Sequence, residues 1–556
     1  MTPAFPEAES GPGQRWAALV ILAVAGAAGV WLRLSGVDQK LFFGDELHTV
    51  GRLHESWWTV FTTYDFLGSG TVLPLLQKAS AHLFGADELT LRLPAVIPGI
   101  LSIPLFYPLM RQLYGSLVAS TGVLLLAVSH FAVFHARNGR IYSLSLCIAI
   151  VLTLLVLRMA QGMQRGQGAA VAGLSAFAVW CHPANGAFVL ILGVYLFATL
   201  VRRKAGREQY MVWLWTFGGG CFLSLLLFLP TFYQVAAFGR AKVGTGMRVD
   251  AGMVMRYLSG GGLNAVLFFI LAPLGMITGL LKRAPHRGLV TLTIALGVAV
   301  ILVVRPYGIA DAYARYLIFL VPFLLIAVLD GLVAVAWCVQ RVVGGRVPVA
   351  AVVAVVFAGV YWAVGYEGAR RDRHSGFIPR AKDFTLVDMA KRLPWASPAY
   401  DDIGRDSTCR RVVEFPYSYW HSIEIYFWHH AIHGKDIYMG AAGDTGEYNR
   451  YVNILDLHAD WGSGTRLIIH KNIAAESRML ADHLRIQPEI EQLGLDPGDF
   501  QPHADVRPMP WIDPEGKSLD LDDILRQVVR QYGPGMYEDE WIVVFRIPDR
   551  VNQTRY

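Results

Sequence analysis

The chain has 556 residues, of which 54% are hydrophobic and 17% are charged. In a typical soluble domain about a quarter of the residues are charged, so this composition excludes an ordinary soluble protein and indicates an integral membrane protein. The formal net charge of +6 is modest, which suits contact with the anionic surface of membrane lipids. No basic module with interleaved aromatic residues stands out, so we expect no nucleic acid among the partners.

Apolar runs long enough to cross about 30 Å of hydrocarbon recur along the first two thirds of the chain and stop near Tyr366. They predict a polytopic α-helical membrane protein with about eleven transmembrane helices. The expected spans lie near residues 16–33, 92–110, 116–134, 142–158, 168–183, 184–201, 211–232, 263–281, 288–304, 316–338 and 347–366.

Basic residues gather in one set of alternate short loops, as in Arg202-Arg203-Lys204. Because such loops stay in the cytoplasm, residues 1–15 form a cytoplasmic N-terminus in this interpretation. Residues 16–366 form the transmembrane domain, with a first outer loop at 34–91, and residues 367–556 form a soluble domain. An odd number of spans makes that domain periplasmic or extracellular. Short loops and the absence of a disulfide pattern favour a bacterial inner membrane.

The soluble domain alternates strand-like and helix-like runs, which predicts a small α/β domain. The expected strands are 411–415, 436–439, 466–470 and 541–547, and the expected helices are 422–433 and 474–484. Asp520-Leu521-Asp522 imitates the Asp-x-Asp of nucleotide-sugar enzymes, but it precedes a helical run, so a helix cap is the better interpretation. His429 and His433 have the spacing of some metal sites, but aromatic neighbours favour a packed or surface helix.

An adjacent pair of acids, Asp45 and Glu46, follows the first span. Charged groups near the bilayer core are costly and usually face a cavity or a partner, and a carboxylate there can act as a general base. The alternative is a cap on an interfacial helix. Asp45, Glu46 and His48 also have the donor types to hold a divalent metal ion, which is the one cofactor left open. His182, at an outer span junction, is either a wall or metal residue of a site or a satisfied membrane histidine.

Arginines recur at the outer ends of two spans. Arg137 and Arg140 are three residues apart, so in a helix they would share a face, and paired guanidinium groups suit phosphate recognition. Arg315 lies at the outer end of the tenth span. The alternative for each arginine is an interfacial anchor whose charge reaches the lipid headgroups.

Four motifs in this order resemble those of the GT-C glycosyltransferases, in the branch of the protein O-mannosyltransferases and the lipid A aminoarabinose transferases. The resemblance covers about residues 16–340, and the order is more specific than any one motif. Members of this group take a sugar from a polyprenyl phosphate at the outer membrane face and pass it to an acceptor. The motifs are Asp45-Glu46, Phe84–Pro94 (FGADELTLRLP), Ala136–Tyr142 (ARNGRIY) and Ala314–Leu317 (ARYL).

The resemblance implies a GT-C fold and an inverting transfer of a sugar from a polyprenyl-phosphate donor to a lipid, glycan or protein acceptor. Asp45 would be the general base with Glu46 as its companion, and Arg137, Arg140 and Arg315 would bind the lipid phosphate. The chemistry is consistent, because fixed cations stabilise the departing phosphate while a base on the opposite side of the sugar activates the acceptor hydroxyl.

Two other classes of function stay open. The chain could be a transporter or flippase of a lipid-linked sugar, or a non-catalytic envelope assembly protein whose soluble domain recruits a partner. A transporter would more naturally carry charges in the middle of its spans and have discontinuous helices in both halves. Here the charges gather at one membrane face, which favours surface chemistry.

Overall fold

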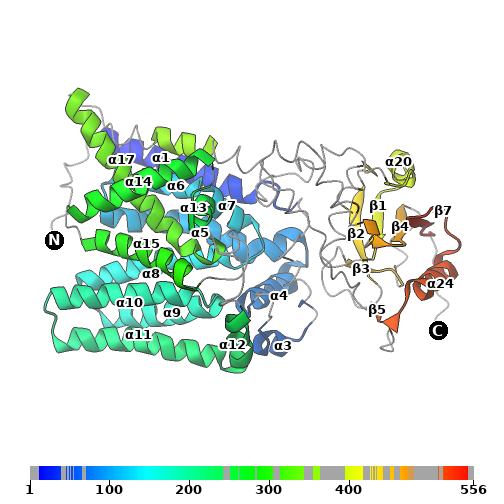
Figure 1. The fold of residues 1–556 in the computed structure, drawn as a ribbon, viewed down its shortest axis with the longest axis horizontal. Coiled ribbons are helices and arrows are strands. Elements are labelled where there is room, and N and C mark those ends of the chain that lie inside the picture. Colours follow the sequence, from blue (N-terminus) through cyan, green and yellow to red (C-terminus); the bar gives the residue numbers. More distant parts are fainter. Residues whose placement is uncertain are drawn as a thin grey trace.

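The computed structural model contains a bundle of helices followed in the chain by a smaller part built on a β-sheet (Figure 1). The structure describes residues 12–38, 46, 49, 52–53, 55–64, 70–241, 251–260, 262–281, 285–304, 314–343, 355–363, 395–416, 426, 429, 432–433, 435–441, 451–455, 457, 464–473, 475–476, 479, 511–512 and 518–548.

The helical part is built from long apolar helices joined by short connections. In chain order these are α1 (Pro12–Leu34), α3 (Trp57–Thr62), α4 (Val72–Phe84), α5 (Glu88–Leu113), α6 (Ser116–Ala127), α7 (His130–Arg137), α8 (Tyr142–Gln161), α9 (Arg165–Cys181), α10 (Asn185–Arg202), α11 (Arg207–Phe228), η2 (Leu229–Thr231), α12 (Phe232–Ala241), α13 (Ala251–Ser259), α14 (Gly262–Leu281), α15 (Pro285–Val304), η3 (Ile318–Leu320) and α17 (Val321–Val343).

Within the described residues, seven helices are long and apolar enough to cross a membrane, and α6 with α7 would make an eighth. That pair is bent by 51° at its break. The sequence predicted about eleven spans. The difference arises at α9, which has only 17 residues, and at α15 and the eleventh span, whose side chains are described only over 287–299 and 355–363. The chain is a polytopic helical membrane protein.

The core of the helical part forms around α17, in which every residue from Val321 to Leu332 is buried. Helix α14 packs closely along it. Two glycines make this possible, because a Cβ on Gly275 would overlap the Ala327 carbonyl and one on Gly331 would overlap the Leu271 carbonyl. Small residues at such crossings let helix backbones approach in the absence of a hydrophobic driving force.

The main sheet has six strands in the order β3-β2-β1-β4-β8-β7. Strand β1 pairs in parallel with β2 on one side and β4 on the other, and β8 pairs antiparallel with both β4 and β7. All four predicted strands are confirmed. The bounds are β1 (Arg411–Phe415), β2 (Asp436–Ala441), β3 (Tyr451–Asn453), β4 (Thr465–His470), β7 (Tyr537–Glu538) and β8 (Ile542–Arg546), with a separate pair β5 (Trp511–Ile512) and β6 (Ser518–Leu519).

Side chains alternate across this sheet and are covered by a helix on each face. Val413 and Phe415 pack with α24 (Leu521–Tyr532), whereas Val412 packs on the other face with α20 (Ala399–Arg405). Glu414 and His470 are therefore expected on the α20 face, since residues two apart in a strand share a side. The predicted cap on α24 is confirmed, because the Asp520 carboxylate accepts the amide of Asp523 at 2.7 Å. The described residues of the two predicted helices, 422–433 and 474–484, are helical.

Candidate active site

The structure describes only one of the two acids that the sequence singles out after the first span. Asp45 and His48 lie outside the described residues, whereas Glu46 is described and buried, with 2% of its surface exposed. Its carboxylate forms a bidentate ion pair with Arg92 of α5, with Nε–Oε1 and Nη2–Oε2 distances of 2.9 Å. The amide of Gly139 also donates to Oε1, at 2.5 Å. Glu46 thus ties the outer loop to α5 and to the turn after α7.

Arg92 has no exposed surface and completes this network by donating from Nη1 to the Val37 carbonyl at 2.7 Å. A buried ion pair is favourable only when further hydrogen bonds satisfy the remaining polar atoms. Here both Glu46 oxygens and three guanidinium nitrogens are used. The pair therefore has the properties of a positioning element.

Arg137 contacts a neighbouring helix end. Its Nη1 donates to the carbonyls of Leu32 and Ser35, at 2.8 and 2.7 Å, where the last carbonyls of α1 have no partner within their own helix. Arg33 of α1 does the reverse, donating to the Ala127 carbonyl at 2.9 Å at the end of α6. These two arginines lock α1 against the bent pair α6 and α7.

The prediction that Arg137 and Arg140 share a helix face is wrong. Helix α7 ends at Arg137 because Asn138 has an extended backbone, with φ −94° and ψ 129°. Arg140 lies in the α7–α8 turn (Asn138–Ile141), where Glu46 accepts the amide of Gly139 and Gln77 donates to its carbonyl at 3.3 Å. The turn is thereby held on both sides, and it fixes the backbone next to Arg140.

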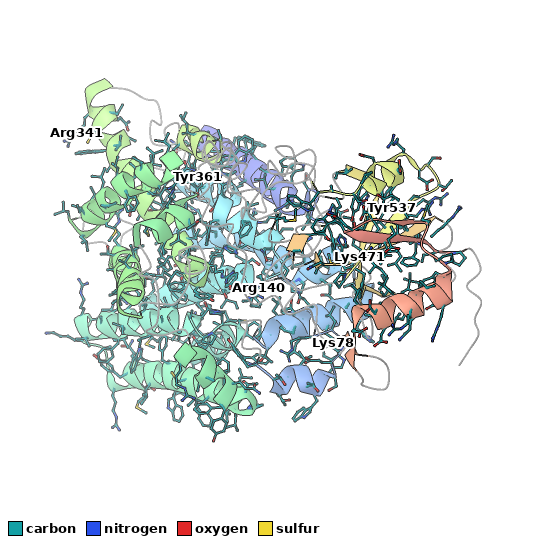
Figure 2. All side chains as sticks on the ribbon, turned by 45° about the vertical axis from the view of Figure 1, so that its right-hand side comes forward. Lys78, Arg140, Arg341, Tyr361, Lys471 and Tyr537 are labelled. Carbon is teal, nitrogen blue, oxygen red and sulfur yellow. The ribbon has the colours of Figure 1, made fainter. Side chains whose placement is uncertain are left out.

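Arg140 is 3% exposed and lies within the helical part, as Figure 2 shows. It contributes to an arginine–aromatic cluster drawn from three parts of the chain. Tyr142 begins α8, His182 joins α9 to α10, and Arg315 and Tyr316 precede η3. The positive charges of Arg140 and Arg315 both act on the His182 imidazole.

Ring contacts hold the cluster together. The Arg315 guanidinium lies 5.7 Å from the ring centre of Tyr142 and 5.6 Å from that of Tyr316, within the range of cation–π attraction. His182 stacks on Tyr316 at 4.8 Å, and its Nδ1 accepts the Ala184 amide at 3.2 Å. The structure thus brings together three predicted residues, Arg140, Arg315 and His182.

Two basic residues hold the loop between α1 and α4 in place. Arg52 pairs with Glu55 at 3.0 Å and donates to the Thr63 carbonyl at 3.1 Å. Lys78 of α4 donates to the Leu53 carbonyl and lies 5.5 Å from the ring centre of Trp57. The short helix α3 is capped by Ser56, whose hydroxyl accepts the Thr59 amide at 3.1 Å. These contacts shape the loop that carries the acidic pair.

Sequence reasoning missed the partners that orient the predicted residues. Arg92 stands in the FGADELTLRLP motif, and an arginine entering an apolar span is a signal for a buried partner. Tyr142 and Tyr316 each stand in a motif with a predicted arginine, and their aromatic rings were the available sign of a cation–π site. Arg33 gave the same kind of signal at the end of the first span.

Chemically, the cluster can hold an anion. The cluster brings together the guanidinium groups of Arg140 and Arg315, the rings of Tyr142 and Tyr316, and the His182 imidazole. Arg140 is buried, and a buried charge acts more strongly than a charge in water. Guanidinium groups bind phosphate oxygens through two parallel N–H groups. A phosphate monoester or diester is therefore the ligand class that these side chains suit best.

Part of the chain matches a known family model. Residues 69–234 match the family model described as dolichyl-phosphate-mannose-protein mannosyltransferase. The match includes α4, the Gly139–Arg140 turn and His182 but ends before Arg315. No curated protein matches the chain.

Two solved structures of ArnT from Cupriavidus metallidurans are also similar. The apo state is 15% identical, with 82% of this chain and 93% of that chain covered and a TM-score of 0.46. The state bound to undecaprenyl phosphate is 14% identical, with 95% and 97% covered and a TM-score of 0.48. Both TM-scores are below 0.5, so these are similarities and no more. The family model covers residues 69–234, less than a third of the chain, so the chain is a polytopic helical membrane protein that is similar to this glycosyltransferase family over that stretch.

Proposed function

We propose that this protein moves a sugar from a polyprenyl-phosphate donor to a lipid, glycan or protein acceptor at the outer face of a bacterial inner membrane. The N-terminus lies in the cytoplasm and the sheet-containing part lies outside. The observation that carries the proposal is the convergence of Arg140 and Arg315 on one aromatic cluster, next to a turn that Glu46 fixes.

Arg140 and Arg315 bind the donor phosphate in this proposal. The leaving group gains negative charge as the bond from the sugar carbon to the phosphate oxygen breaks, and preorganised cations stabilise that charge without reorganising. Tyr142 and Tyr316 keep the Arg315 guanidinium in place, and His182 forms part of the wall. Arg137 supports the site at one remove, by holding α7 against α1.

Asp45 acts as the general base. It takes the proton of the acceptor hydroxyl while the hydroxyl oxygen bonds to the sugar carbon and the phosphate leaves with the electron pair. A single displacement of this kind inverts the sugar configuration. Asp45 lies outside the described residues, but it directly precedes Glu46, whose buried carboxylate is fixed by Arg92 and Gly139. Glu46 is thus a companion that positions the base.

The test uses full-length protein in lipid nanodiscs with a panel of undecaprenyl-phosphate-linked sugars and cell-envelope extract as the acceptor. Release of free polyprenyl phosphate is measured for wild type, Asp45→Asn and Arg140→Ala. We expect Asp45→Asn to lower turnover by about 100-fold or more and Arg140→Ala to lower it by about 100- to 1,000-fold. Arg341→Ala is the matched control, since Arg341 is exposed and lies far from Arg140 (Figure 2).

Each outcome separates the candidate functions. Equal turnover of wild type and Asp45→Asn removes Asp45 from the mechanism. Donor binding without release of phosphate, with every acceptor fraction supplied, favours a transporter or flippase of the lipid-linked sugar. Loss of turnover in Arg341→Ala as large as in Arg140→Ala would contradict a specific role for the cluster.

A further inference from the structure

A second group of functional side chains lies in the sheet-containing part, far along the chain from the arginine–aromatic cluster. Glu414 is in the C-terminal half of β1, and His470 is the last residue of β4. These strands are parallel neighbours, and the chain continues from β1 to β2 on the opposite side. Ligand sites in such sheets form at the carboxyl ends of the strands where the strand order reverses, which is the position of Glu414 and His470.

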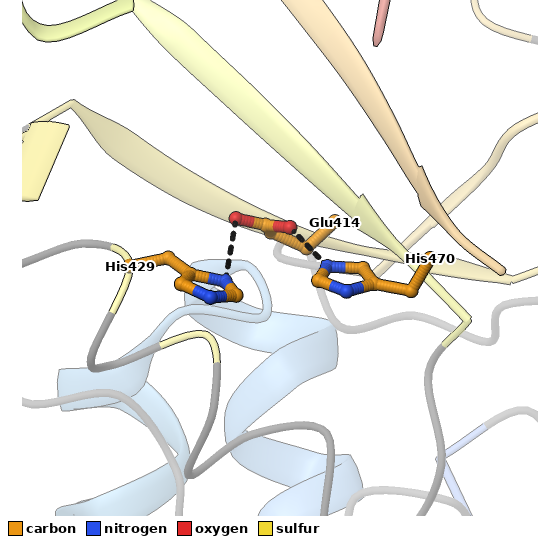
Figure 3. A group of neighbouring side chains, drawn as sticks. All are labelled: Glu414, His429 and His470. Carbon is orange, nitrogen blue, oxygen red and sulfur yellow. Dashed lines mark hydrogen bonds and ion pairs between the residues drawn. The ribbon is translucent and has the colours of Figure 1, made fainter. Parts of the chain in front are cut away.

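The three side chains in Figure 3 meet at this edge. His470 Nε2 lies 2.7 Å from Glu414 Oε2, and His429 Nδ1 lies 3.9 Å from Glu414 Oε1. On its other side, His470 Nδ1 contacts Glu476 Oε1 at 2.7 Å. Glu414, His429 and His470 each have 1% or less of their surface exposed.

Several polar atoms of this group lack partners. Within the described part of the chain, both ring nitrogens of His429 and the Oε1 atom of Glu414 are buried with no hydrogen-bond partner. Leaving a buried polar atom unsatisfied costs about 1–3 kcal/mol, so each such atom requires an explanation. Glu414 Oε1 and one ring nitrogen of His429 are explained together if a ligand lies between the two side chains.

We propose that Glu414, His429 and His470 bind a structural divalent metal ion, with zinc as the best match. One potential ligand atom from each residue lies within 4.8 Å of the others. Two imidazoles and a carboxylate form a donor set that zinc uses in proteins. Glu476 strengthens the assignment, because a metal-binding histidine usually gives its second ring N–H to a carboxylate, which directs the free nitrogen at the ion.

The distances between the potential ligand atoms fit a zinc site if the side chains shift slightly. Zinc bonds of about 2.0–2.2 Å in a tetrahedron separate the ligand atoms by about 3.4 Å. The separations of 2.7 Å from His470 Nε2 to Glu414 Oε2 and of 3.9 Å from His429 Nδ1 to Glu414 Oε1 lie on either side of that value and involve the two different carboxylate oxygens. The Tyr400 hydroxyl lies 3.3 Å from Glu414 Oε2 and 3.4 Å from His470 Nε2, beside the position of the ion.

Charge balance also favours the ion. The group buries two carboxylates, Glu414 and Glu476, and a divalent cation would neutralise both. A protonated His470 between the two acids would account for its own two contacts, but it would leave His429 and one Glu414 oxygen unsatisfied. The metal accounts for the Glu414 oxygen and for one ring nitrogen of His429.

Complete burial indicates a structural role for the ion. The three side chains leave a fourth tetrahedral position, but with 1% or less of the surface of each residue exposed that position is closed to substrate. The ion would join β1, β4 and the helical residue His429 under Tyr400, whose ring stacks on His429 at 4.0 Å. It would thereby fix the loops at the carboxyl edge of the sheet.

The test measures metal content in full-length protein purified without a histidine tag and dialysed against zinc. We expect about one zinc per chain in wild type, visible absorption of tetrahedral cobalt after exchange, and loss of both in His429→Ala. Glu476→Gln keeps the ligands and should bind zinc about 10- to 100-fold more weakly in a chelator competition. His82→Ala removes an exposed histidine of α4 and should retain the metal.

The outcomes decide between three states of the group. Absence of zinc and cobalt from folded wild type would overturn the proposal and leave a metal-free Glu414–His470–Glu476 network. Zinc retained equally in His429→Ala and His470→Ala would also overturn it, since the ion would then be bound elsewhere. If the histidine variants fail to fold, wild-type stoichiometry and the affinity of Glu476→Gln still give the answer. None of these measurements depends on glycosyl transfer.

Discussion

Two buried glutamates, Glu46 and Glu414, differ in how their oxygens are used. Glu46 lies among the helices, where Arg92 and the Gly139 amide donate to both of its oxygens. Glu414 lies in the sheet, where His470 contacts Oε2 and where Oε1 has no hydrogen-bond partner among the described residues. The first carboxylate is satisfied by the protein itself, and the second is not.

This difference separates positioning from ligand binding. An ion pair whose charges are matched within the protein holds together the segments that contribute to it. A buried carboxylate oxygen that has no hydrogen-bond partner is costly unless a ligand binds it. Glu46 is accordingly a support for the neighbouring site, whereas Glu414 has the features of a ligand.

The largest expected effect comes from breaking the Glu46–Arg92 ion pair. Arg92→Met removes the charged partner of the buried Glu46 carboxylate, which should destabilise the helical part by about 3–5 kcal/mol. Thermal unfolding in detergent, followed by helical circular dichroism, measures the loss. Sugar transfer should fall with it, because the Gly139 turn loses its fixed partner.

The double variant Glu46→Gln with Arg92→Met is the control for that experiment. It removes the charge together with its partner, so much of the stability should return. A double variant as unstable as Arg92→Met alone would mean that packing, and not the unpaired charge, dominates the loss.

Metal removal should have the next largest effect, and it should be confined to the sheet. Zinc at about 1,000 times its dissociation constant stabilises the folded state by about 4 kcal/mol. Hydrogen exchange of the β1 and β4 amides, measured with zinc and with chelator, reports this locally. In Glu414→Gln the two conditions should give the same protection. Zinc-dependent protection that persists in the variant would contradict the assignment.

Strands and caps could be predicted from sequence because their signals are local. The β-branched runs at 411–415 and 466–470 and the acid before α24 each determine structure within a few residues. The arginines at the outer face were also recognisable, since a charge beside an apolar span is rare and costly.

Contacts between distant segments could not be predicted in this way. Arg137 binds the end of α1, about a hundred residues away in the chain, and the break at Asn138 separates it from Arg140. His429 was assigned to packing because His470 and Glu414, its neighbours in space, stand far from it in sequence. Pairing across the fold depends on tertiary packing, which a single sequence does not reveal.

Arg137 provides the third prediction, in which an arginine that binds backbone carbonyls is compared with one of the cluster. Arg137→Met removes two charged hydrogen bonds to α1 carbonyls and should lower stability by about 1.5–3 kcal/mol. Its Michaelis constant for the donor should stay near that of wild type, whereas Arg140→Ala should raise it with little change in stability. Measuring the stability and the Michaelis constant of both variants tests this difference between the two arginines. A large rise in the Michaelis constant for Arg137→Met, without loss of stability, would mean that Arg137 binds the donor phosphate.

The smallest effect is expected at Asp406, a partly exposed acid whose partners are complete. Its Oδ1 accepts the amide and the hydroxyl of Thr408, at 2.9 and 2.6 Å, and Arg466 pairs with Oδ2. The Thr408 hydrogen bonds and the Arg466 charge lower the pKa of Asp406 from 3.8 to about 2, although burial opposes the shift. Because the pKa is lower in the folded state, the ionised form stabilises the fold.

That stabilisation is present in full above about pH 4 and is lost as the pH falls from about 4 towards 2. Asp406→Asn removes it at neutral pH, where a partly exposed group contributes about 1 kcal/mol or less, equivalent to about 2–4 °C in a domain of this size. The difference in melting temperature between wild type and Asp406→Asn should therefore shrink on acidification. Asp402→Asn, in an exposed pair with Arg405, should show almost no difference at any pH. A gap for Asp406→Asn that stays constant down to pH 2 would mean that its hydrogen-bond geometry, and not its charge, supports the sheet.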